Sequence, residues 1–202
     1  MENSVLTRLI EYAGTFAFAI SGIRLASIKQ FDLFGAFIVG FTAAVGGGTA
    51  RDVFLGQSPF WLFQPSYLVC TIAALIFVIL FKRYILLFEH TILVFDTIGL
   101  GFFTLVGIEK TLTLGHSLWV CVVMGMITGA VGGIARDVIT NEVPIVFQKE
   151  IYALACVFGG IFFCVLYKTG APRTVLQLGT SAAVILVRVI AIRFRIGLPI
   201  LR

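Results

Sequence analysis

The stretch Gly46-Gly47-Gly48-Thr49-Ala50-Arg51-Asp52-Val53 occurs in this chain almost twice. Adding 85 to each number leads to a second copy, Gly132-Gly133-Ile134-Ala135-Arg136-Asp137-Val138, in which Val131 stands in place of the first glycine. Consecutive glycines weaken a helix, and charged side chains are costly inside a membrane. A chain that repeats both features in apolar surroundings is expected to build a site from them.

The same offset relates many other positions. It pairs Glu11 with Asp96, Gly22 with Gly107, Gly40 with Gly125, Pro59 with Pro144 and Tyr67 with Tyr152. The register holds without a gap from about residue 11 to residue 152, which indicates an internal duplication.

Composition indicates an integral membrane protein. Of the 202 residues, 59% are hydrophobic and 12% are charged, and the mean hydropathy is +1.07. An average soluble domain is far less apolar. The net charge of +5 comes from basic residues that lie singly or in pairs at the edges of apolar runs. That placement favours anchoring in a lipid bilayer over binding of nucleic acid.

Seven apolar runs predict an all-α protein of seven transmembrane helices, since a helix needs about 20 residues to cross the bilayer. The runs cover about 5–26, 33–53, 67–81, 92–108, 118–138, 151–167 and 175–192, and residues 86–88 are expected to extend the third. We expect a single membrane domain over 1–202, with repeat one at about 5–83, repeat two at about 90–168 and a closing helix at about 173–195. Three helices per repeat is an odd number, so the repeats must be inverted.

The distribution of Lys and Arg predicts the orientation. Four basic residues fall on the side of the N-terminus, namely Arg8, Lys110, Lys168 and Arg173. Eight fall on the other side, namely Arg24, Lys29, Lys82, Arg83, Lys149, Arg193, Arg195 and Arg202. The positive-inside rule therefore places the C-terminus in the cytoplasm and the N-terminus outside, in an inner (cell) membrane.

The glycines have two interpretations. Gly46, Gly47 and Gly48, with Gly132 and Gly133, are expected to unwind or kink their helices and free carbonyls that favour a cation, because glycine-interrupted segments in inverted halves mark a midplane site. Alternatively, they allow helices to cross closely, as small residues commonly do.

The charged residues are expected to pair across helices. The repeat places Glu11 at the depth of Arg51-Asp52 and Asp96 at the depth of Arg136-Asp137, so we predict Glu11–Arg51 and Asp96–Arg136 ion pairs. These groups form either charged rings at the two mouths of a pathway or buried pairs that fix helix register. Arg188, in the last helix, either snorkels or meets a carboxylate.

No pattern points to an enzyme, a metal site or a bound cofactor. The chain has no phosphate-binding loop and no H-E-x-x-H motif. Four cysteines, Cys70, Cys121, Cys156 and Cys164, lie inside apolar runs without a C-x-x-C pair, so we interpret them as small buried hydrophobic residues.

These patterns resemble the prokaryotic trimeric intracellular cation (TRIC) channel family. The resemblance rests on Phe18-Ala19-Ile20-Ser21-Gly22, Asp32-Leu33-Phe34-Gly35, the segment from Thr42 to Asp52 and its repeat from Gly132 to Asp137. It implies a homotrimer with a pore in each protomer, lined by the second and fifth helices with Gly46, Gly47, Gly48, Gly132 and Gly133. The bacterial branch is also described as carrying glycine transporter domains.

Two functions remain open at this point. The first is a passive channel for monovalent cations, with potassium as the permeant ion. The second is a transporter or facilitator for glycine or another small zwitterion. A zwitterion site needs a fixed charge near each pole, and predicted pairing of the carboxylates with arginines would neutralise them, so the sequence favours the channel.

The orientation is testable by labelling single introduced cysteines in intact cells. A cysteine near Thr113 is expected to react with a membrane-impermeant reagent, and one near Asn141 is not. The reverse pattern would overturn the predicted orientation.

Overall fold

The computed structural model describes residues 5–83, 90–148 and 151–198, and every regular element in these ranges is helical. The elements are α1 (Val5–Ile28), α2 (Leu33–Phe54), η1 (Phe60–Leu62), α3 (Ser66–Leu80), α5 (Thr91–Thr113), α6 (Leu118–Ile139), η2 (Ile145–Phe147), α7 (Ala153–Lys168) and α8 (Arg173–Arg193). The predicted all-α class with seven α-helices is confirmed. The expected extension at residues 86–88 lies outside the described ranges.

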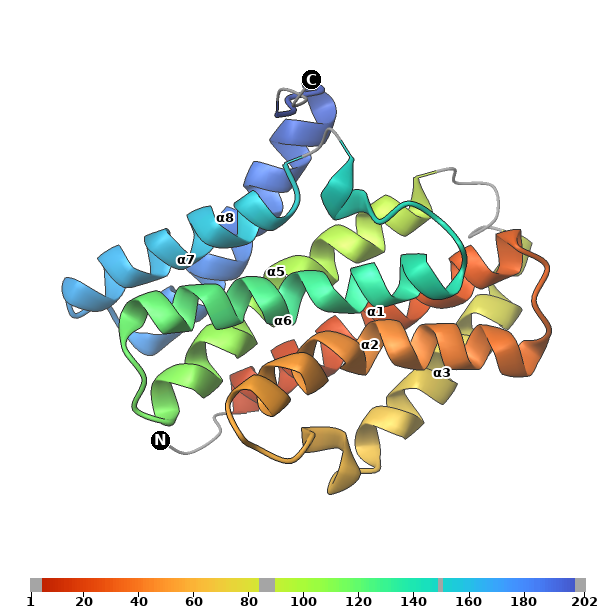
Figure 1. Cartoon of the computed structure of the whole chain (residues 1–202), viewed down its shortest axis with the longest axis horizontal. Helices are drawn as coiled ribbons and strands as arrows, with labels where there is room; N and C mark the ends of the chain where they lie inside the picture. The colour runs from red at the N-terminus through yellow and green to blue at the C-terminus, as the bar shows by residue number, and fades with distance from the viewer. Residues whose placement is uncertain (1–4, 84–89, 149–150, 199–202) are drawn as a thin grey trace.

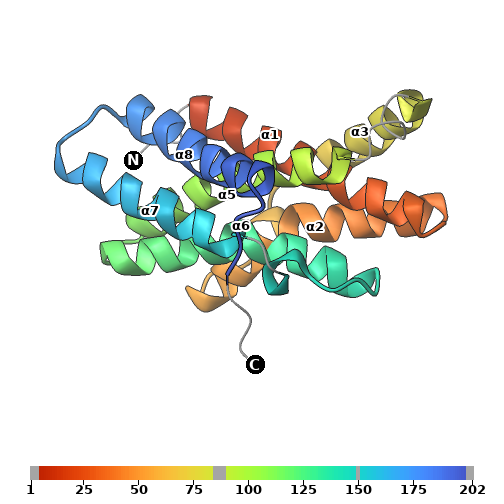
Figure 2. The ribbon, with the colours of Figure 1, turned by 90° about the horizontal axis from the view of Figure 1, so that it is seen from above.

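Four helices form the centre of the molecule. α2 packs against α6, α1 against α5, and each repeat also packs its first two helices together (Figure 1). α3 covers α1 and α2, and α7 covers α5 and α6, on opposite flanks of this centre (Figure 2). The two repeats thus occupy equivalent positions, whereas α8 lies on α5 and α7 and has no equivalent.

The helix ends are repeated as well as the helices. Gln30 after α1 and Gly115 after α5 have positive φ angles of 59° and 82°, and Gly56 after α2 and Asn141 after α6 have 66° and 56°. A left-handed residue after the last turn lets the chain reverse while its amides bond the final carbonyls. Each pair is 85 residues apart, so the duplication includes the turns.

The glycines do not interrupt their helices. α2 and α6 are continuous α-helices through Gly46–Gly48 and Gly132–Gly133, so the expected unwinding is wrong. A Cβ on Gly47 would overlap the carbonyl oxygen of Thr128, and one on Gly132 would overlap that of Ala43. These glycines let α2 and α6 touch through their backbones, which is the packing interpretation.

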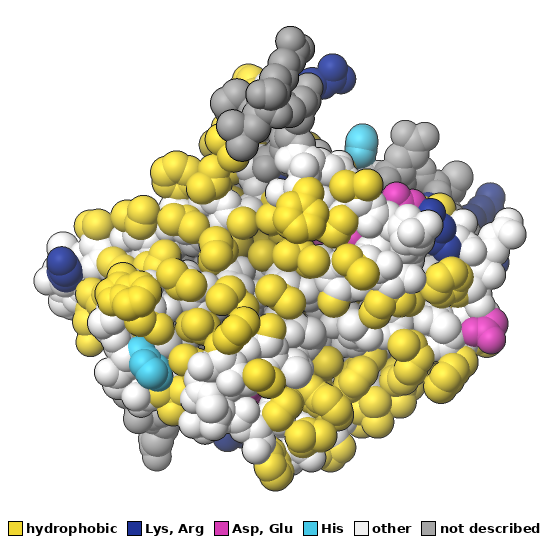
Figure 3. Space-filling model, viewed as in Figure 1, with side chains coloured by type: hydrophobic (Ala, Val, Ile, Leu, Met, Phe, Trp, Pro, Cys, Tyr) yellow, Lys and Arg dark blue, Asp and Glu magenta, His cyan; other side chains and the backbone are white. Residues whose placement is uncertain are grey.

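The outer surface suits a bilayer. By length and composition, five helices of the described part can cross a membrane, namely α1, α2, α5, α6 and α8. α3 and α7, with 15 and 16 residues, are shorter. Hydrophobic side chains cover the middle of the face in Figure 3, and most charged ones lie towards its edges. Exposed residues such as Phe34 and Trp119, each 71% accessible, are placed to contact lipid.

The helix crossing gives a matched pair of variants. Gly47→Ala is expected to lower the thermal midpoint in detergent, because overpacking costs about 1–3 kcal/mol. Gly46→Ala is expected to leave the midpoint unchanged or to raise it, since its Cβ would lie 3.6 Å from the nearest atom, the Cα of Gly132. Equal midpoints for the two variants would contradict the close crossing.

Candidate functional site

Two related charge clusters lie at opposite ends of the bundle. Repeat one contributes Glu11, Arg51, Asp52 and Tyr67, and repeat two contributes Asp96, Arg136, Asp137 and Tyr152 at the positions 85 residues later. In each repeat the Arg-Asp pair lies near the C-terminal end of the second helix. The duplication therefore supplies the same four kinds of side chain twice.

The cluster of repeat two is closed. Arg136 donates from Nη1 to Asp96 Oδ1 at 2.6 Å and from Nε to Asp137 Oδ1 at 2.8 Å, and it also donates to the hydroxyl of Ser21. The hydroxyl of Tyr152 donates to Asp96 Oδ1 at 3.4 Å. All five side chains are buried. The predicted Asp96–Arg136 pair is confirmed.

The cluster of repeat one is arranged differently. Arg51 binds its own neighbour Asp52, with Nε to Oδ1 at 2.8 Å and Nη2 to Oδ1 at 2.7 Å. Glu11 instead accepts a hydrogen bond from the hydroxyl of Tyr67 at 3.2 Å. The predicted Glu11–Arg51 pair is therefore wrong. Asp52 gains a second cation, Lys110 of α5, at 3.0 Å.

Both Asp side chains also hold the backbone. Asp52 Oδ2 accepts from the amide of Phe60 at 3.0 Å, and Asp137 Oδ2 accepts from the amide of Ile145 at 3.2 Å. Each contact fixes the start of the 3-10 helix after its transmembrane helix. Buried carboxylates need such partners, because an unpaired charge in this environment costs several kcal/mol.

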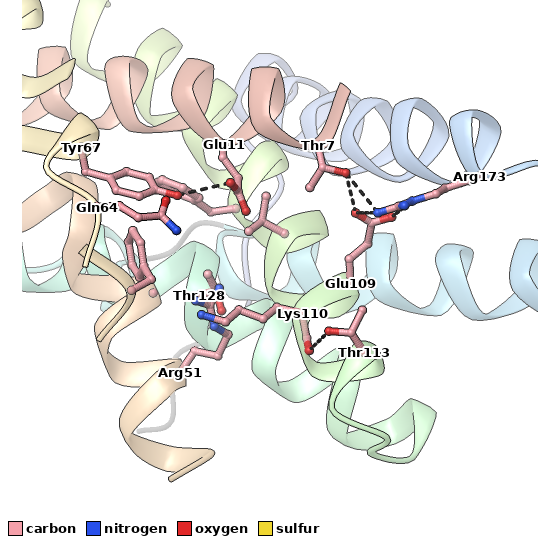
Figure 4. A pocket seen from close by; sticks show the side chains of 14 residues that line it. Thr7, Glu11, Arg51, Gln64, Tyr67, Glu109, Lys110, Thr113, Thr128 and Arg173 are labelled. Atoms are coloured by element: carbon pink, nitrogen blue, oxygen red, sulfur yellow. Dashed lines mark hydrogen bonds and ion pairs between the residues drawn. The ribbon is translucent and has the colours of Figure 1, made fainter. Parts of the chain in front are cut away.

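A polar cavity of about 250 Å³ opens beside the cluster of repeat one. Its lining comes from α1, α2, η1, the connection from η1 to α3, α3, α5, α8 and the middle of α6: Thr7, Glu11, Gly48, Arg51, Phe60, Gln64, Tyr67, Phe103, Val106, Glu109, Lys110, Thr113, Thr128 and Arg173. Figure 4 shows Glu11 and Tyr67 on one wall and Arg51 and Lys110 on the facing wall. We call this space the vestibule.

The vestibule has a second charged wall that the sequence analysis missed. Glu109 accepts from Arg173 Nε at 3.1 Å and from Gln177 Nε2 at 3.0 Å, which joins α5 to α8. Gln177 also donates to Thr7 at 2.9 Å, which adds α1. The signal was present in the sequence: Glu109 and Lys110 directly follow the predicted run 92–108, and α5 continues through both to Thr113.

The predicted glycines lie in three different places. Gly48 lines the vestibule, whereas Gly47 and Gly132 lie at the helix crossing. A Cβ on Gly133 would lie 2.6 Å from the hydroxyl oxygen of Tyr152, so this glycine makes room for the closed cluster. Arg188 is also buried there: it donates to the carbonyl of Ile151 at 3.2 Å, and its guanidinium lies 5.1 Å from the centre of the Tyr152 ring.

Known proteins resemble this chain in sequence. The sequence model of the family described as "Glycine transporter" matches residues 8–83 and 93–168. The chain belongs to this family. It is 39% identical over 199 residues to the UPF0126 membrane protein of Vibrio cholerae, covering 98% of this chain and 83% of the relative. It is also 36% identical to the UPF0126 inner membrane protein YadS of Escherichia coli K12, covering 96% of each.

The fold matches a solved channel. The TRIC trimeric intracellular cation channel orthologue from Rhodobacter sphaeroides superposes with a TM-score of 0.87 at 32% identity, covering 96% of this chain and 100% of the relative. The resemblance stated from the sequence is thus confirmed, and the chain is a multi-pass inner membrane protein with a TRIC-like fold. The solved relatives are cation channels and not enzymes.

The two clusters predict different responses to matched neutral substitutions. Asp96→Asn removes one partner of a buried pair and is expected to lower stability by about 3 kcal/mol or more. Glu11→Gln loses only a carboxylate that faces the vestibule and accepts one hydrogen bond, so we expect a loss of about 1 kcal/mol or less. Thermal unfolding of both variants in the same detergent checks this difference, and a larger loss for Glu11→Gln would contradict it.

Proposed function

We propose that this protein is a passive, potassium-permeable cation channel, with a pathway inside each protomer of a homotrimer. The observation that carries the proposal is the vestibule, a polar cavity that runs from the helix ends near the N-terminus to Thr128 in the middle of α6. A polar cavity at this depth is unusual in a transmembrane bundle unless it serves transport. The likeness to trimeric cation channels supports the assembly and the permeant ion.

The proposed pathway continues from the vestibule along the crossing of α2 and α6 and leaves past the cluster of repeat two. Arg136 blocks that exit in the present conformation, since it is fully buried and held by three side chains. Asp96 Oδ2 and Arg136 Nη2 are buried without a hydrogen-bond partner in the described part of the chain. Once the exit opens, Asp96 Oδ2 is suited to accept from water or to meet a permeant cation, and Arg136 Nη2 is suited to donate to water.

The glycines have a proposed role in that opening. The backbones of α2 and α6 touch at Gly47 and Gly132 without intervening side chains, so a small rotation of one helix against the other changes the exit directly. A Cβ on Gly46 would meet α6 only at ordinary van der Waals distance, 3.6 Å from the Cα of Gly132, and Gly133 lies beside Tyr152 and Asp96. With the N-terminus outside, the vestibule is the external mouth.

A second function has one observation in its favour. Glu11 is not neutralised by Arg51, and the vestibule presents a carboxylate on one wall and two cations, Arg51 and Lys110, on the other. Opposite charges on facing walls suit the two poles of a small zwitterion. Transport of glycine is therefore the alternative, in keeping with the family's description.

Potassium current and glycine uptake distinguish the two proposals. Purified protein in planar bilayers is expected to carry a potassium current, and the same preparation in proteoliposomes is expected to show no saturable uptake of radiolabelled glycine. Uptake without current would replace the channel by the carrier. Mass measurement of the detergent complex checks the trimer.

Glu11→Gln is expected to lower potassium current at low salt, because a carboxylate at the mouth concentrates cations there. The difference from the parent is expected to shrink between about 0.1 M and about 1 M KCl, as the screening length falls from about 10 Å to about 3 Å. Glu142→Gln serves as the control, since Glu142 pairs with Lys29 outside the vestibule. A salt-independent loss would mean that Glu11 acts through structure rather than charge.

A further inference from the structure

Lys110 binds both oxygens of a buried carboxylate from the side of the vestibule. Its ammonium lies 3.0 Å from Asp52 Oδ1 and 3.1 Å from Oδ2. It also lies 5.6 Å from the centre of the Phe60 ring, within the range of a cation–π interaction. The ammonium therefore sits in a position defined by two carboxylate oxygens and an aromatic face.

This position separates Asp52 from the vestibule. The side chain of Asp52 is fully buried, whereas that of Lys110 is 33% exposed. Lys110 and Phe60 line the vestibule and Asp52 does not. Movement of the lysine side chain would expose the carboxylate to the contents of the cavity.

The second repeat shows that the fold does not require this lysine. Asp137, the equivalent of Asp52, is bound by Arg136 and by the amide of Ile145, as Asp52 is bound by Arg51 and by the amide of Phe60. The residue 85 positions before Lys110 is Leu25, which carries no charge. Lys110 is thus an addition to a cluster whose structural contacts are already complete.

We infer that Asp52 and Phe60 form a binding site for a monovalent cation, and that the Lys110 ammonium occupies this site as a tethered competitor of potassium. A primary ammonium and a potassium ion carry the same charge, and carboxylate oxygens and aromatic faces attract both. The flexible four-carbon stem of lysine allows its head group to leave without moving the helix. The permeant ion and the Lys110 ammonium then replace one another at Asp52, on the side of the vestibule lined by Lys110 and Phe60.

This inference rests on the proposed channel for its physiological meaning, but the site itself can be tested without conduction. Lys110→Met keeps an unbranched side chain, one heavy atom shorter, and removes its charge. Thermal midpoints are measured in potassium chloride and in N-methyl-D-glucamine chloride at equal ionic strength. Lys110→Met is expected to gain a potassium-specific upward shift of the midpoint that the parent lacks.

Lys29→Met is a matched control, because Lys29 also pairs with a carboxylate, Glu142, and its side chain is also 33% exposed. The control and Lys110→Arg, which keeps the charge, are expected to respond equally to both salts. An equal response of Lys110→Met to both salts would overturn the site. If Lys110→Met does not fold, Lys110→Gln is measured in the same way.

Current recordings separate this inference from the channel proposal. In bilayers at low potassium chloride, Lys110→Met is expected to conduct more than the parent, since potassium no longer competes with the ammonium. An unchanged or smaller current beside a conducting parent would overturn the role as competitor. A silent parent would remove the channel proposal, while the potassium-specific stabilisation would still report the site.

Discussion

The contact between α2 and α6 is the constraint on which the rest of this structure depends. Gly47 and Gly132 approach the carbonyls of Thr128 and Ala43 so closely that neither position can hold a Cβ. Helices at this distance place both Arg-Asp pairs on the inner side of the bundle, one towards each end. Because apolar association is weak in lipid, such backbone contact is a principal source of specific packing in a membrane protein.

Around this contact the two repeats keep one backbone plan and differ in charge. Repeat two combines one arginine with two carboxylates and buries all three. The cluster of repeat one combines Arg51, Glu11 and Asp52 with Lys110, which comes from α5 of repeat two, and Val106 takes the place that Ser21 has beside Arg136. The structure therefore has an open vestibule at one end and a closed cluster at the other. This asymmetry is what one conformation of a transport protein would show.

The sequence pattern predicted some contacts of this structure correctly and others wrongly. The apolar runs predicted the seven helices, and the offset of 85 residues predicted the inverted repeats and the Asp96–Arg136 pair, all of which the structure contains. It also predicted a Glu11–Arg51 pair by analogy, and that pair is absent, since Arg51 turns to Asp52 and Glu11 to Tyr67. The glycines were expected to break helices, but favourable packing of α2 against α6 outweighs their low helix propensity.

The sequence by itself determined the membrane location, the number and order of the helices and the duplication, because these depend on apolar run length and on a repeat that can be counted. The tertiary structure alone decided which carboxylate meets which cation. Lys110 reaches Asp52 across 58 positions, and Glu109 meets Arg173 across 64. Such partners depend on which helix faces pack together and on side-chain rotamers. The internal repeat relates each residue only to its own copy, so it gives no information on either.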